Sequence, residues 1–326
     1  MPRRWLECLA LFSSYLGVLG VLTVAFGMIG RVLPVRSLHI SVLVALLGGG
    51  CAGHARTNPS FDLTAPAARG ALRQMAASPR RLERPVVVLG GFGDPGVAPN
   101  YLAGEVRKLT GDRRVLPVSF GFWESLDDCR ARVIRDVGRA FPCDDSEWTR
   151  EVDVIAVSLG GVVARHAAAA PPAPSGRRLR VARLFTISSP HRGAAVAALP
   201  AIPFMGGLQT DLRRGSKFLR SLEQSEQPAA YPVYPYVRLG DSLVGAANAA
   251  PYGQDPWWVA TPPLEGPHTF AYCDARIVAD IVRRLRGEEP FAKDPPEPLP
   301  GRHATAATPA SGPSPRPSPL GTGESG

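Results

Sequence analysis

The sequence predicts an α/β protein built on a mostly parallel β-sheet with helices on both faces. Three observations predict it. Between residues 84 and 287, aliphatic runs of strand length alternate with segments of helix length, and the first run is continuous. A later run passes into a helix across a Ser-Leu-Gly-Gly turn. With 326 residues, 45% of them apolar and 20% charged, the chain is long enough to bury a large core. This composition excludes collagenous, coiled-coil and wholly disordered proteins.

The first elements follow from residues 86–120. Val86 to Leu89 is an uninterrupted aliphatic run, which is typical of a strand buried on both faces. The Gly-rich segment 90–96 ends this strand with a turn. We expect a helix over residues 99–110 and a second strand over residues 115–120.

The next elements surround a Ser-Leu-Gly-Gly turn. Apolar residues at helical spacing predict an amphipathic helix over residues 125–141. Residues 152–157 form the third strand, and the helix at 162–170 follows it without a linker. Two prolines, Pro171 and Pro172, end that helix.

Two more strands and a closing helix complete the region. We expect the strands over residues 180–187 and 233–239 and the helix over residues 272–285. Strands joined by helical crossovers imply a mostly parallel sheet, in which sites lie at the carboxyl ends of the strands. The long connection at about 194–228 predicts a small cap insertion between the strand that ends near residue 187 and the strand that begins near residue 233.

The first 51 residues are a hydrophobic membrane or signal segment. Leu9–Gly30 has 22 uncharged positions, enough to span a bilayer. A second apolar run at residues 40–50 is too short to span, follows a basic stretch and ends at Cys51. From Met28 onward this unit resembles a bacterial lipoprotein signal, which implies that Cys51 becomes the lipid-carrying first residue.

Three alternatives stay open for this segment. Translation that begins at Met28 would omit most of the first apolar run, and signal cleavage after Ala55 would release a secreted protein. Without cleavage, Leu9–Gly30 would remain as a transmembrane anchor. Each alternative predicts export or membrane attachment, so we expect an exported and membrane-associated protein.

The net charge of +9 is concentrated beside the hydrophobic segment. Residues 1–51 carry +3, residues 52–82 carry +4, residues 83–287 carry +4, and the remainder carries −2. This distribution is typical of membrane targeting, and the sequence has no basic helix with interleaved aromatic residues that would suggest a nucleic-acid partner. We therefore predict that residues 52–83 form a basic linker, that residues 84–287 form the folded domain, and that the Pro-rich residues 288–326 form a disordered tail.

The most specific chemical signal is the turn at Ser158. A strand that enters a helix through small-x-Ser-x-Gly makes a strained elbow, which raises the serine hydroxyl at the edge of the sheet. Small residues are needed because the flanking backbones pass close together, and here Ala156, Gly160 and Gly161 occupy those positions. The pattern predicts a nucleophile, and the alternative is a serine that only caps the helix.

The chain resembles bacterial lipases and esterases of the α/β-hydrolase superfamily in five successive segments, RPVVVLGGFGD, VIAVSLGG, FTISSPHRG, RLGDSLV and GPHTF. The resemblance covers roughly residues 84–286 and implies the α/β-hydrolase fold, with a catalytic serine, acid and histidine in that chain order. It implies Asp241 as the acid and His268 as the base. Asp255 remains the alternative acid, and His191 remains the alternative histidine.

The same resemblance implies an oxyanion hole made of two backbone N–H groups. They belong to Phe92, after the first strand, and to Leu159, directly after the nucleophile. The chain departs from the family at the preceding positions, where Gly90-Gly91 replaces the usual His-Gly. Because the donor is a backbone group, the replacement leaves it in place, and the expected cost is a looser loop.

Candidate substrate-binding residues are Gly91, His191, Trp257 and Trp258. In the resembled family the motif of His191 is structural or lines the pocket. The two tryptophans are candidates for an acyl pocket or a membrane contact, and core packing is the alternative. A small cap suits a lipid or aryl ester better than a polymer, and the alternative for this segment is a packed connector.

The sequence therefore predicts a serine ester hydrolase of lipase or esterase type, which acts on a lipid or small ester and associates with the membrane through its N-terminus. Acyl transfer, thioester cleavage and amide cleavage are alternatives on the same triad. An inactive α/β-hydrolase that binds a lipid or a partner is a third, because of Ala156 and the missing loop histidine. The chemistry needs no cofactor or metal, and no cysteine spacing resembles a zinc site.

Overall fold

A parallel six-stranded sheet lies at the centre of the structure, a computed structural model that describes residues 57–122, 125–170, 176–200, 205–225 and 231–303. The strands are β1 (Val86–Leu89), β2 (Val115–Val118), β3 (Val152–Val157), β4 (Val181–Ile187), β5 (Val233–Arg238) and β6 (Trp257–Val259). Their order is β2-β1-β3-β4-β5-β6, and every neighbouring pair is parallel. The predicted fold class is confirmed, and β6 is a strand that the sequence did not predict.

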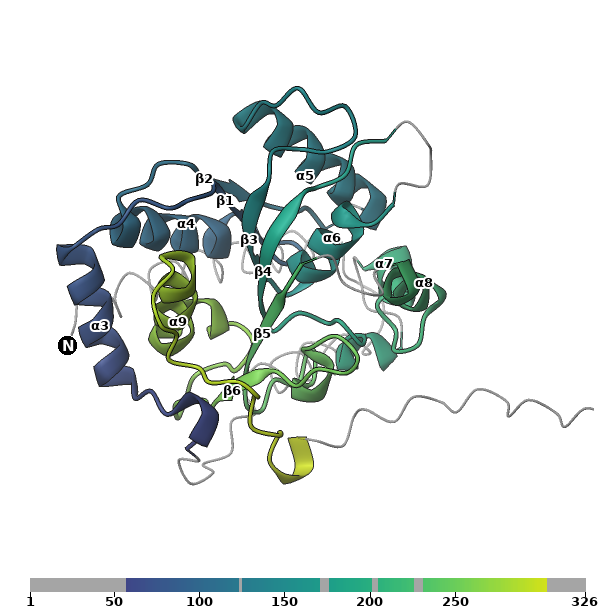
Figure 1. The fold of residues 1–326 in the computed structure, drawn as a ribbon. Helices are drawn as coiled ribbons and strands as arrows, with labels where there is room; N and C mark the ends of the chain where they lie inside the picture. The colour runs from purple at the N-terminus through teal and green to yellow at the C-terminus, as the bar shows by residue number, and fades with distance from the viewer. Residues whose placement is uncertain (1–56, 123–124, 171–175, 201–204, 226–230, 304–326) are drawn as a thin grey trace, which may run out of the picture.

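Helices cover both faces of this sheet (Figure 1). One face carries α3 (Ala65–Ala77), α4 (Val97–Thr110) and α9 (Ala275–Leu285). The other carries α5 (Leu126–Ala140), α6 (Leu159–Ala168), α7 (Gly206–Asp211) and α8 (Lys217–Ser225). Short 3-10 helices are η1 (Pro59–Phe61), η2 (Ala195–Ala198), η3 (Ala246–Asn248), η4 (Ala271–Cys273) and η5 (Gly301–His303). Because strand side chains alternate between faces, Val86 and Val88 join the first core, whereas Val87 and Leu89 join the second.

The strand order reverses direction between β1 and β3. The chain runs from β1 outward to β2, and then returns past β1 to form β3 on its other side. Ligands of open parallel sheets bind where the order reverses, beyond the carboxyl ends of the strands. The turn after β1 carries Phe92, and the turn after β3 carries Ser158, so the fold brings these two predicted site segments to one edge.

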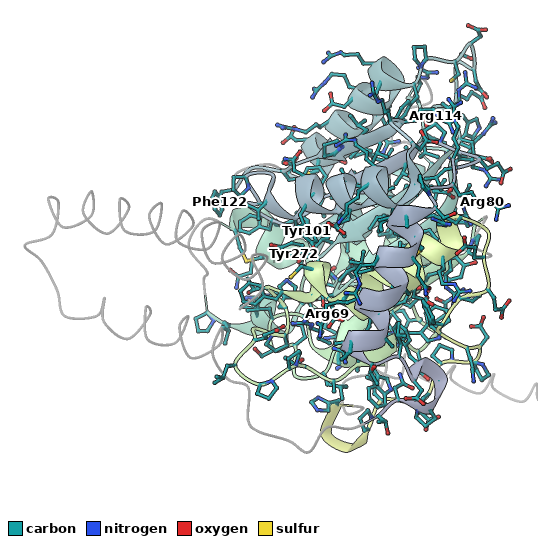
Figure 2. All side chains as sticks on the ribbon, turned by 90° about the vertical axis from the view of Figure 1, so that its left-hand side faces the viewer. Arg69, Arg80, Tyr101, Arg114, Phe122 and Tyr272 are labelled. Carbon is teal, nitrogen blue, oxygen red and sulfur yellow. The ribbon has the colours of Figure 1, made fainter. Side chains whose placement is uncertain are left out.

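The prediction of a linker over residues 52–83 is wrong for the part that the structure describes. Helix α3 packs on α4 and α9 through Ala68, Leu72 and Met75, which belong to the core on that side of the sheet. Arg69 and Arg73 are exposed, and Figure 2 shows Arg69 on this helix. The basic composition concealed this helix, because only three of its side chains, Ala68, Leu72 and Met75, are buried, and its arginines are exposed.

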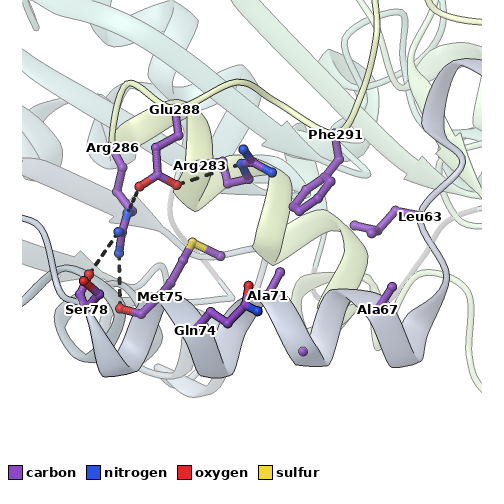
Figure 3. Close-up of a pocket in the computed structure, with 11 residues that line it drawn as sticks. Leu63, Ala67, Ala71, Gln74, Met75, Ser78, Arg283, Arg286, Glu288 and Phe291 are labelled. Carbon is purple, nitrogen blue, oxygen red and sulfur yellow. Dashed lines mark hydrogen bonds and ion pairs between the residues drawn. The ribbon is translucent and has the colours of Figure 1, made fainter.

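The prediction of a disordered tail from residue 288 is wrong as far as residue 303. The buried carboxylate of Asp280 accepts hydrogen bonds from the backbone N–H groups of Phe291 and Ala292 at 2.5 and 2.8 Å. Phe291 also helps to enclose a cavity of about 510 Å³ between α3 and the end of α9 (Figure 3). Polar partners buried elsewhere in the domain order this segment, which has few large apolar residues of its own.

Residues 1–56 lie outside the described part of the chain. The predictions on Leu9–Gly30, Met28, Cys51 and Ala55 concern those residues, as the rest of the predicted tail concerns residues 304–326. Within the described ranges, no helix has both the length and the apolar content needed to cross a membrane.

The predicted insertion lies between β4 and β5 and carries η2, α7 and α8. Leu219 and Leu222 of α8 are buried, and Glu223 forms an ion pair with Arg165 of α6 at 2.8 Å. The ring of Phe218 meets the ring of His166 edge to face, with 5.1 Å between the ring centres. Helix α8 therefore packs on the C-terminal half of α6, about two turns from Ser158, which favours the alternative of a packed connector over the predicted cap.

Ending the chain after Gly287 should lower the melting temperature by at least about 5 °C. Asp280 would lose two backbone N–H donors, and the indole N–H groups of Trp257 and Trp258 would lose their carbonyl acceptors. A chain that ends after His303 keeps these contacts and is the matched control. Thermal unfolding of both, beside the full-length chain in the same detergent, is the measurement. If the chains that end after Gly287 and after His303 melt at the same temperature, residues 288–303 do not stabilise the fold.

Candidate active site

Ser158 occupies a strained turn between β3 and α6. Its backbone has φ 51° and ψ −122°, a region that residues with a side chain rarely adopt. A hydrogen bond from its N–H to the carbonyl of Ile187 at 2.9 Å holds the turn against the end of β4. The turn directs the serine to the carboxyl edge of the sheet, as the small-x-Ser-x-Gly pattern predicted.

The glycines after Ser158 permit the close approach of three chain segments. A Cβ on Gly160 would lie 2.7 Å from the carbonyl oxygen of Gly90 and 2.9 Å from that of Leu89. A Cβ on Gly161 would collide with the side chain of Ser189, which follows β4. The methyl group of Ala156 is fully buried, so alanine fits the first small position.

Three side chains from distant parts of the sequence meet at this turn. His268 Nε2 lies 3.1 Å from Ser158 Oγ, and His268 Nδ1 lies 2.8 Å from Asp241 Oδ2. The other oxygen of Asp241 accepts the N–H groups of Leu243 and Val244 at 3.1 and 3.0 Å. Asp241 follows β5 and is buried, so its carboxylate is fixed before it orients the imidazole.

The charges of this pair shift both pKa values. Burial opposes the charged form of His268, but the charge of Asp241 and the hydrogen bond to it outweigh burial and raise the pKa of His268 above 6.5. Burial would raise the pKa of Asp241, yet His268, the Val244 N–H and the nearby Ser188 hydroxyl together lower it below 3.8. Asp241 is therefore ionised at neutral pH, next to a histidine whose pKa it raises.

His191, the alternative histidine, is buried, and it is His268 that contacts Ser158. Its Nε2 lies 3.0 Å from Thr186 Oγ1, and its Nδ1 lies 3.3 Å from the guanidinium of Arg165. Because a guanidinium only donates, Nδ1 must accept and Nε2 must carry the proton. Burial and the neighbouring arginines hold the pKa of His191 well below 6.5. Both ring nitrogens have partners within the fold, which favours a structural role over the predicted contact with substrate.

The two tryptophans are core residues, so the prediction that they bind substrate is wrong. Trp257 stacks on Tyr234 with 6.0 Å between ring centres, and its indole N–H donates to the carbonyl of Lys293 at 2.9 Å. Trp258 donates in the same way to the carbonyl of Glu297 at 2.9 Å. They form most of β6, and the alternative of core packing holds for both. Asp255, the alternative acid, is exposed, and it is Asp241 that contacts His268.

The segment predicted to hold the oxyanion lies beside the serine. A Cβ on Gly91 would lie 3.3 Å from Ser158 Cβ and 3.8 Å from its Oγ, so this residue adjoins the hydroxyl. Among the described residues, neither the Phe92 N–H nor the Leu159 N–H donates to another backbone group. The predicted oxyanion hole requires that these two N–H groups have no backbone acceptor, and this requirement is met.

Asp94, in the turn after β1, fixes the start of α4. Its carboxylate accepts the N–H groups of Gly96, Val97 and Ala98 at 2.7 to 3.2 Å, which caps the start of α4. This aspartate, which the sequence did not predict as a functional residue, orders the part of the turn that leads into α4. The signal was a carboxylate just ahead of a predicted helix.

The cavity of Figure 3 belongs to a different part of the molecule. It is lined by α3, the end of α9 and Phe291, and no residue of the Ser158 site contributes to it. Over the described part of the chain, no three His, Cys, Asp or Glu side chains gather as a metal site would require.

Replacing Gly160 by alanine should destabilise the fold by about 1–3 kcal/mol, because the new methyl group would meet two backbone carbonyl oxygens. Gly104→Ala is the matched control, since Gly104 lies inside α4 with open space around its Cβ position and should tolerate or favour alanine. Denaturant unfolding measures both variants. A Gly160→Ala variant as stable as wild type would contradict the close approach of β1 to this turn.

No protein-family model matches the sequence, and no curated protein matches it. Among solved structures, the mature lipase BlEst2 of Bacillus licheniformis matches with a TM-score of 0.43 and 17% identity, over 64% of this chain and 94% of the lipase. Est1E from Butyrivibrio proteoclasticus matches with a TM-score of 0.37 and 13% identity, over 64% of this chain and 90% of its own. The phospholipase PlaB from Legionella pneumophila matches with a TM-score of 0.37 and 16% identity. The match covers 51% of this chain and 42% of that phospholipase. Each is a distant likeness of fold.

Proposed function

We propose that this chain is a serine hydrolase that cleaves carboxylic esters, of lipase or esterase type, through an acyl-enzyme intermediate. The observation that carries the proposal is the pair of contacts that join Asp241 to His268 and His268 to Ser158, at 2.8 and 3.1 Å. These distances lie within the range expected of a nucleophile, its base and the group that orients the base. They favour a catalytic site over an inactive binding domain.

Each residue has one role in the proposed reaction. His268 Nε2 takes the hydroxyl proton of Ser158 while Oγ attacks the ester carbonyl. The negative oxygen of the tetrahedral intermediate accepts hydrogen bonds from the N–H groups of Phe92 and Leu159. The intermediate collapses to an acyl-serine as His268 gives the proton to the leaving alcohol. In the second half of the reaction, His268 takes a proton from water, the water oxygen attacks the acyl carbonyl, and the proton returns to Ser158 Oγ as the acid is released.

Asp241 supports the histidine without taking its proton. Its carboxylate accepts from Nδ1, which leaves the Nε2 lone pair directed at Ser158, and it stabilises the imidazolium that forms. The same triad would serve acyl transfer, thioester cleavage or amide cleavage. Assays with matched ester, thioester and amide substrates identify the bond that is cleaved.

The proposed substrate is a lipid or small ester at a membrane. The support lies in the sequence before residue 57, where the uncharged Leu9–Gly30 and the signal-like unit ending at Cys51 predict an exported protein attached to the membrane. A membrane-attached esterase would meet lipid esters at the surface that holds it.

Ser158→Ala should abolish labelling by a fluorophosphonate and lower the turnover of p-nitrophenyl esters by at least about 10³-fold, because the nucleophile is lost. The full-length chain in detergent is the sample, and Ser221→Ala, at an exposed serine of α8, is the matched control. Short and long acyl esters, compared in the same assay, rank the acyl length. A Ser158→Ala variant that still labels and turns over would contradict the proposal.

The rate of fluorophosphonate labelling should rise with pH through a midpoint above 6.5, since the neutral form of His268 is the base and Asp241 raises its pKa. Below the midpoint the rate should fall about tenfold per pH unit. Asp241→Asn should move the midpoint to lower pH and cut the rate at least about 10²-fold. The stability that comes from protonated His268 is present below about pH 6.5 and is lost as the pH rises through the raised pKa. A midpoint at or below 6.5 in wild type would contradict this assignment.

A further inference from the structure

His268 lies in a loop, yet its ring must stay aligned with two partners on other elements. The loop runs from the end of β6 at Val259 to η4 at Ala271, and His268 belongs to no helix or strand. Catalytic groups need positioning to well under 1 Å, since a displacement of that size can cost about 10²-fold in rate. The contacts that hold this loop therefore decide whether the proposed reaction proceeds.

Arg238 provides a buried anchor next to the loop. It is the last residue of β5, three positions before Asp241, and it is only 3% exposed. Its Nε donates to Asp274 Oδ2 at 2.8 Å. Its Nη1 lies 2.7 Å from Glu265 Oε2, an ion pair whose geometry is not aligned for a hydrogen bond.

The two carboxylates that Arg238 contacts stand on either side of His268 in the sequence. Glu265 precedes the histidine by three residues, and Asp274 follows it by six. Asp274 also caps α9 by accepting the N–H of Arg276 at 3.0 Å, so the far end of the segment is fixed to a helix. One guanidinium thus ties both ends of the histidine-bearing segment to the strand that leads into Asp241.

The ion pairs of Arg238 need a charged guanidinium and charged carboxylates. Burial opposes the charged form of Arg238, but Asp274 and Glu265 outweigh it, so its pKa is raised. Burial likewise opposes ionisation of Asp274, and the guanidinium groups of Arg276 and Arg238 lower its pKa in spite of it. The arginine and the aspartate therefore stay charged throughout the pH range in which His268 titrates.

We propose that Arg238 is a positioning residue for the triad, which holds the segment 265–274 so that His268 reaches both Ser158 and Asp241. The proposal rests on the proposed function, because positioning matters only if His268 acts on Ser158. The side-chain contacts of Arg238 are with Asp274 and Glu265, not with Ser158, Asp241 or His268. It acts through the loop.

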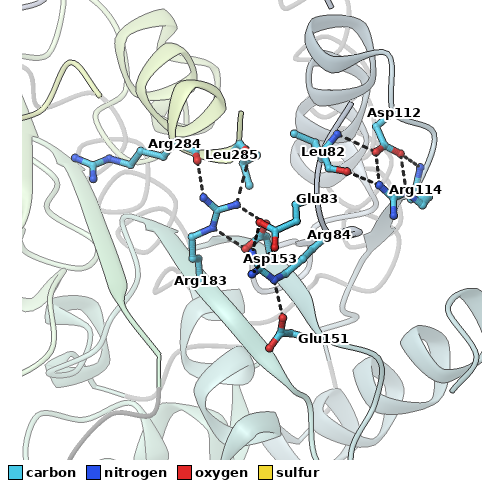
Figure 4. Close-up of polar contacts among 10 residues, drawn as sticks. All are labelled: Leu82, Glu83, Arg84, Asp112, Arg114, Glu151, Asp153, Arg183, Arg284 and Leu285. Atoms are coloured by element: carbon cyan, nitrogen blue, oxygen red, sulfur yellow. Dashed lines mark hydrogen bonds and ion pairs between the residues drawn. The ribbon is translucent and has the colours of Figure 1, made fainter. Parts of the chain in front are cut away.

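The opposite end of the sheet offers a matched control (Figure 4). Arg183 of β4 binds the buried Asp153 of β3 through two contacts, at 2.8 and 2.6 Å, and also donates to the carbonyl of Arg284. Asp153 is the second residue of β3, whereas Ser158 follows the last, so this arginine lies far from the site. Arg183→Gln and Arg238→Gln each remove one charge from an arginine–aspartate pair within the domain.

The experiment compares wild type, Arg238→Gln, Arg238→Lys and Arg183→Gln as full-length chains in detergent. Thermal unfolding sets a temperature at which all are folded, and ester turnover and the pH profile of fluorophosphonate labelling are measured there. For Arg238→Gln we expect kcat to fall about 10- to 100-fold with KM nearly unchanged, and the pH midpoint to drop toward 6.5 as the contact between His268 and Asp241 loosens. Arg238→Lys, which keeps the charge but can align with one carboxylate only, should recover part of kcat.

Arg183→Gln should lower the melting temperature and leave kcat and the pH midpoint at the wild-type values. If Arg238→Gln does the same, the residue is merely structural and the proposal is overturned. Should Arg238→Gln fail to fold, Glu265→Gln removes only the less buried ion pair and should shift kcat and the midpoint in the same direction by a smaller amount. A wild-type kcat and midpoint in that variant would overturn the proposal as well.

Carbon-13 labelling of the histidines separates this proposal from the proposed function. The NMR titration of His268, assigned with His268→Gln, reports its pKa without any ester. If wild type neither labels nor turns over, the proposed function fails, and a His268 pKa that is lowered in Arg238→Gln but unchanged in Arg183→Gln still supports positioning. A His268 pKa that Arg238→Gln leaves unchanged overturns it.

Discussion

The site depends on one steric constraint, the passage of the turn after β3 between the ends of β1 and β4. Gly160 faces the carbonyl oxygens of Leu89 and Gly90, and Gly161 faces Ser189, so only residues without a Cβ fit there. The constraint forces Ser158 into its strained backbone conformation and brings Gly91 against it. Sheet order then determines the rest, because β1 and β3 are neighbours at the point where the chain reverses direction.

The sheet was predictable because its signals are local. A continuous aliphatic run marks β1, and a run that only Asp153 interrupts marks β3. Each lies within one short window of sequence. The errors concern segments whose order comes from distant partners. Helix α3 was hidden by its arginines, and residues 288–303 are held by Asp280 and by two indole N–H groups. The sequence leaves an acyl pocket, a membrane contact and core packing open for Trp257 and Trp258, because an exposed and a buried tryptophan look alike in sequence.

The residues of the site also differ in whether the sequence marks them. Motifs in the sequence placed Ser158, Asp241 and His268 in the expected chain order, and the structure brings their side chains together. No comparable signal marked Arg238, since it is one of 37 basic residues and its partner Asp274 is 36 positions away. Ion pairs of this kind become visible only when the fold is known, because nothing in their spacing distinguishes them from solvated surface charges.

Local strain and distant charge pairs thus act together at this edge of the sheet. The strain at Ser158 fixes the nucleophile, and the buried carboxylate of Asp241 fixes the direction of the imidazole. The central claim is that Ser158 carries an acyl group during turnover. Its most direct test is to mix the full-length chain with a p-nitrophenyl ester, quench in acid within the first turnover, and map the added mass by peptide mass spectrometry. The account predicts an acyl adduct on the peptide that contains Ser158, absent after longer incubation; turnover with no adduct on that serine, or with the adduct on another residue, would contradict it.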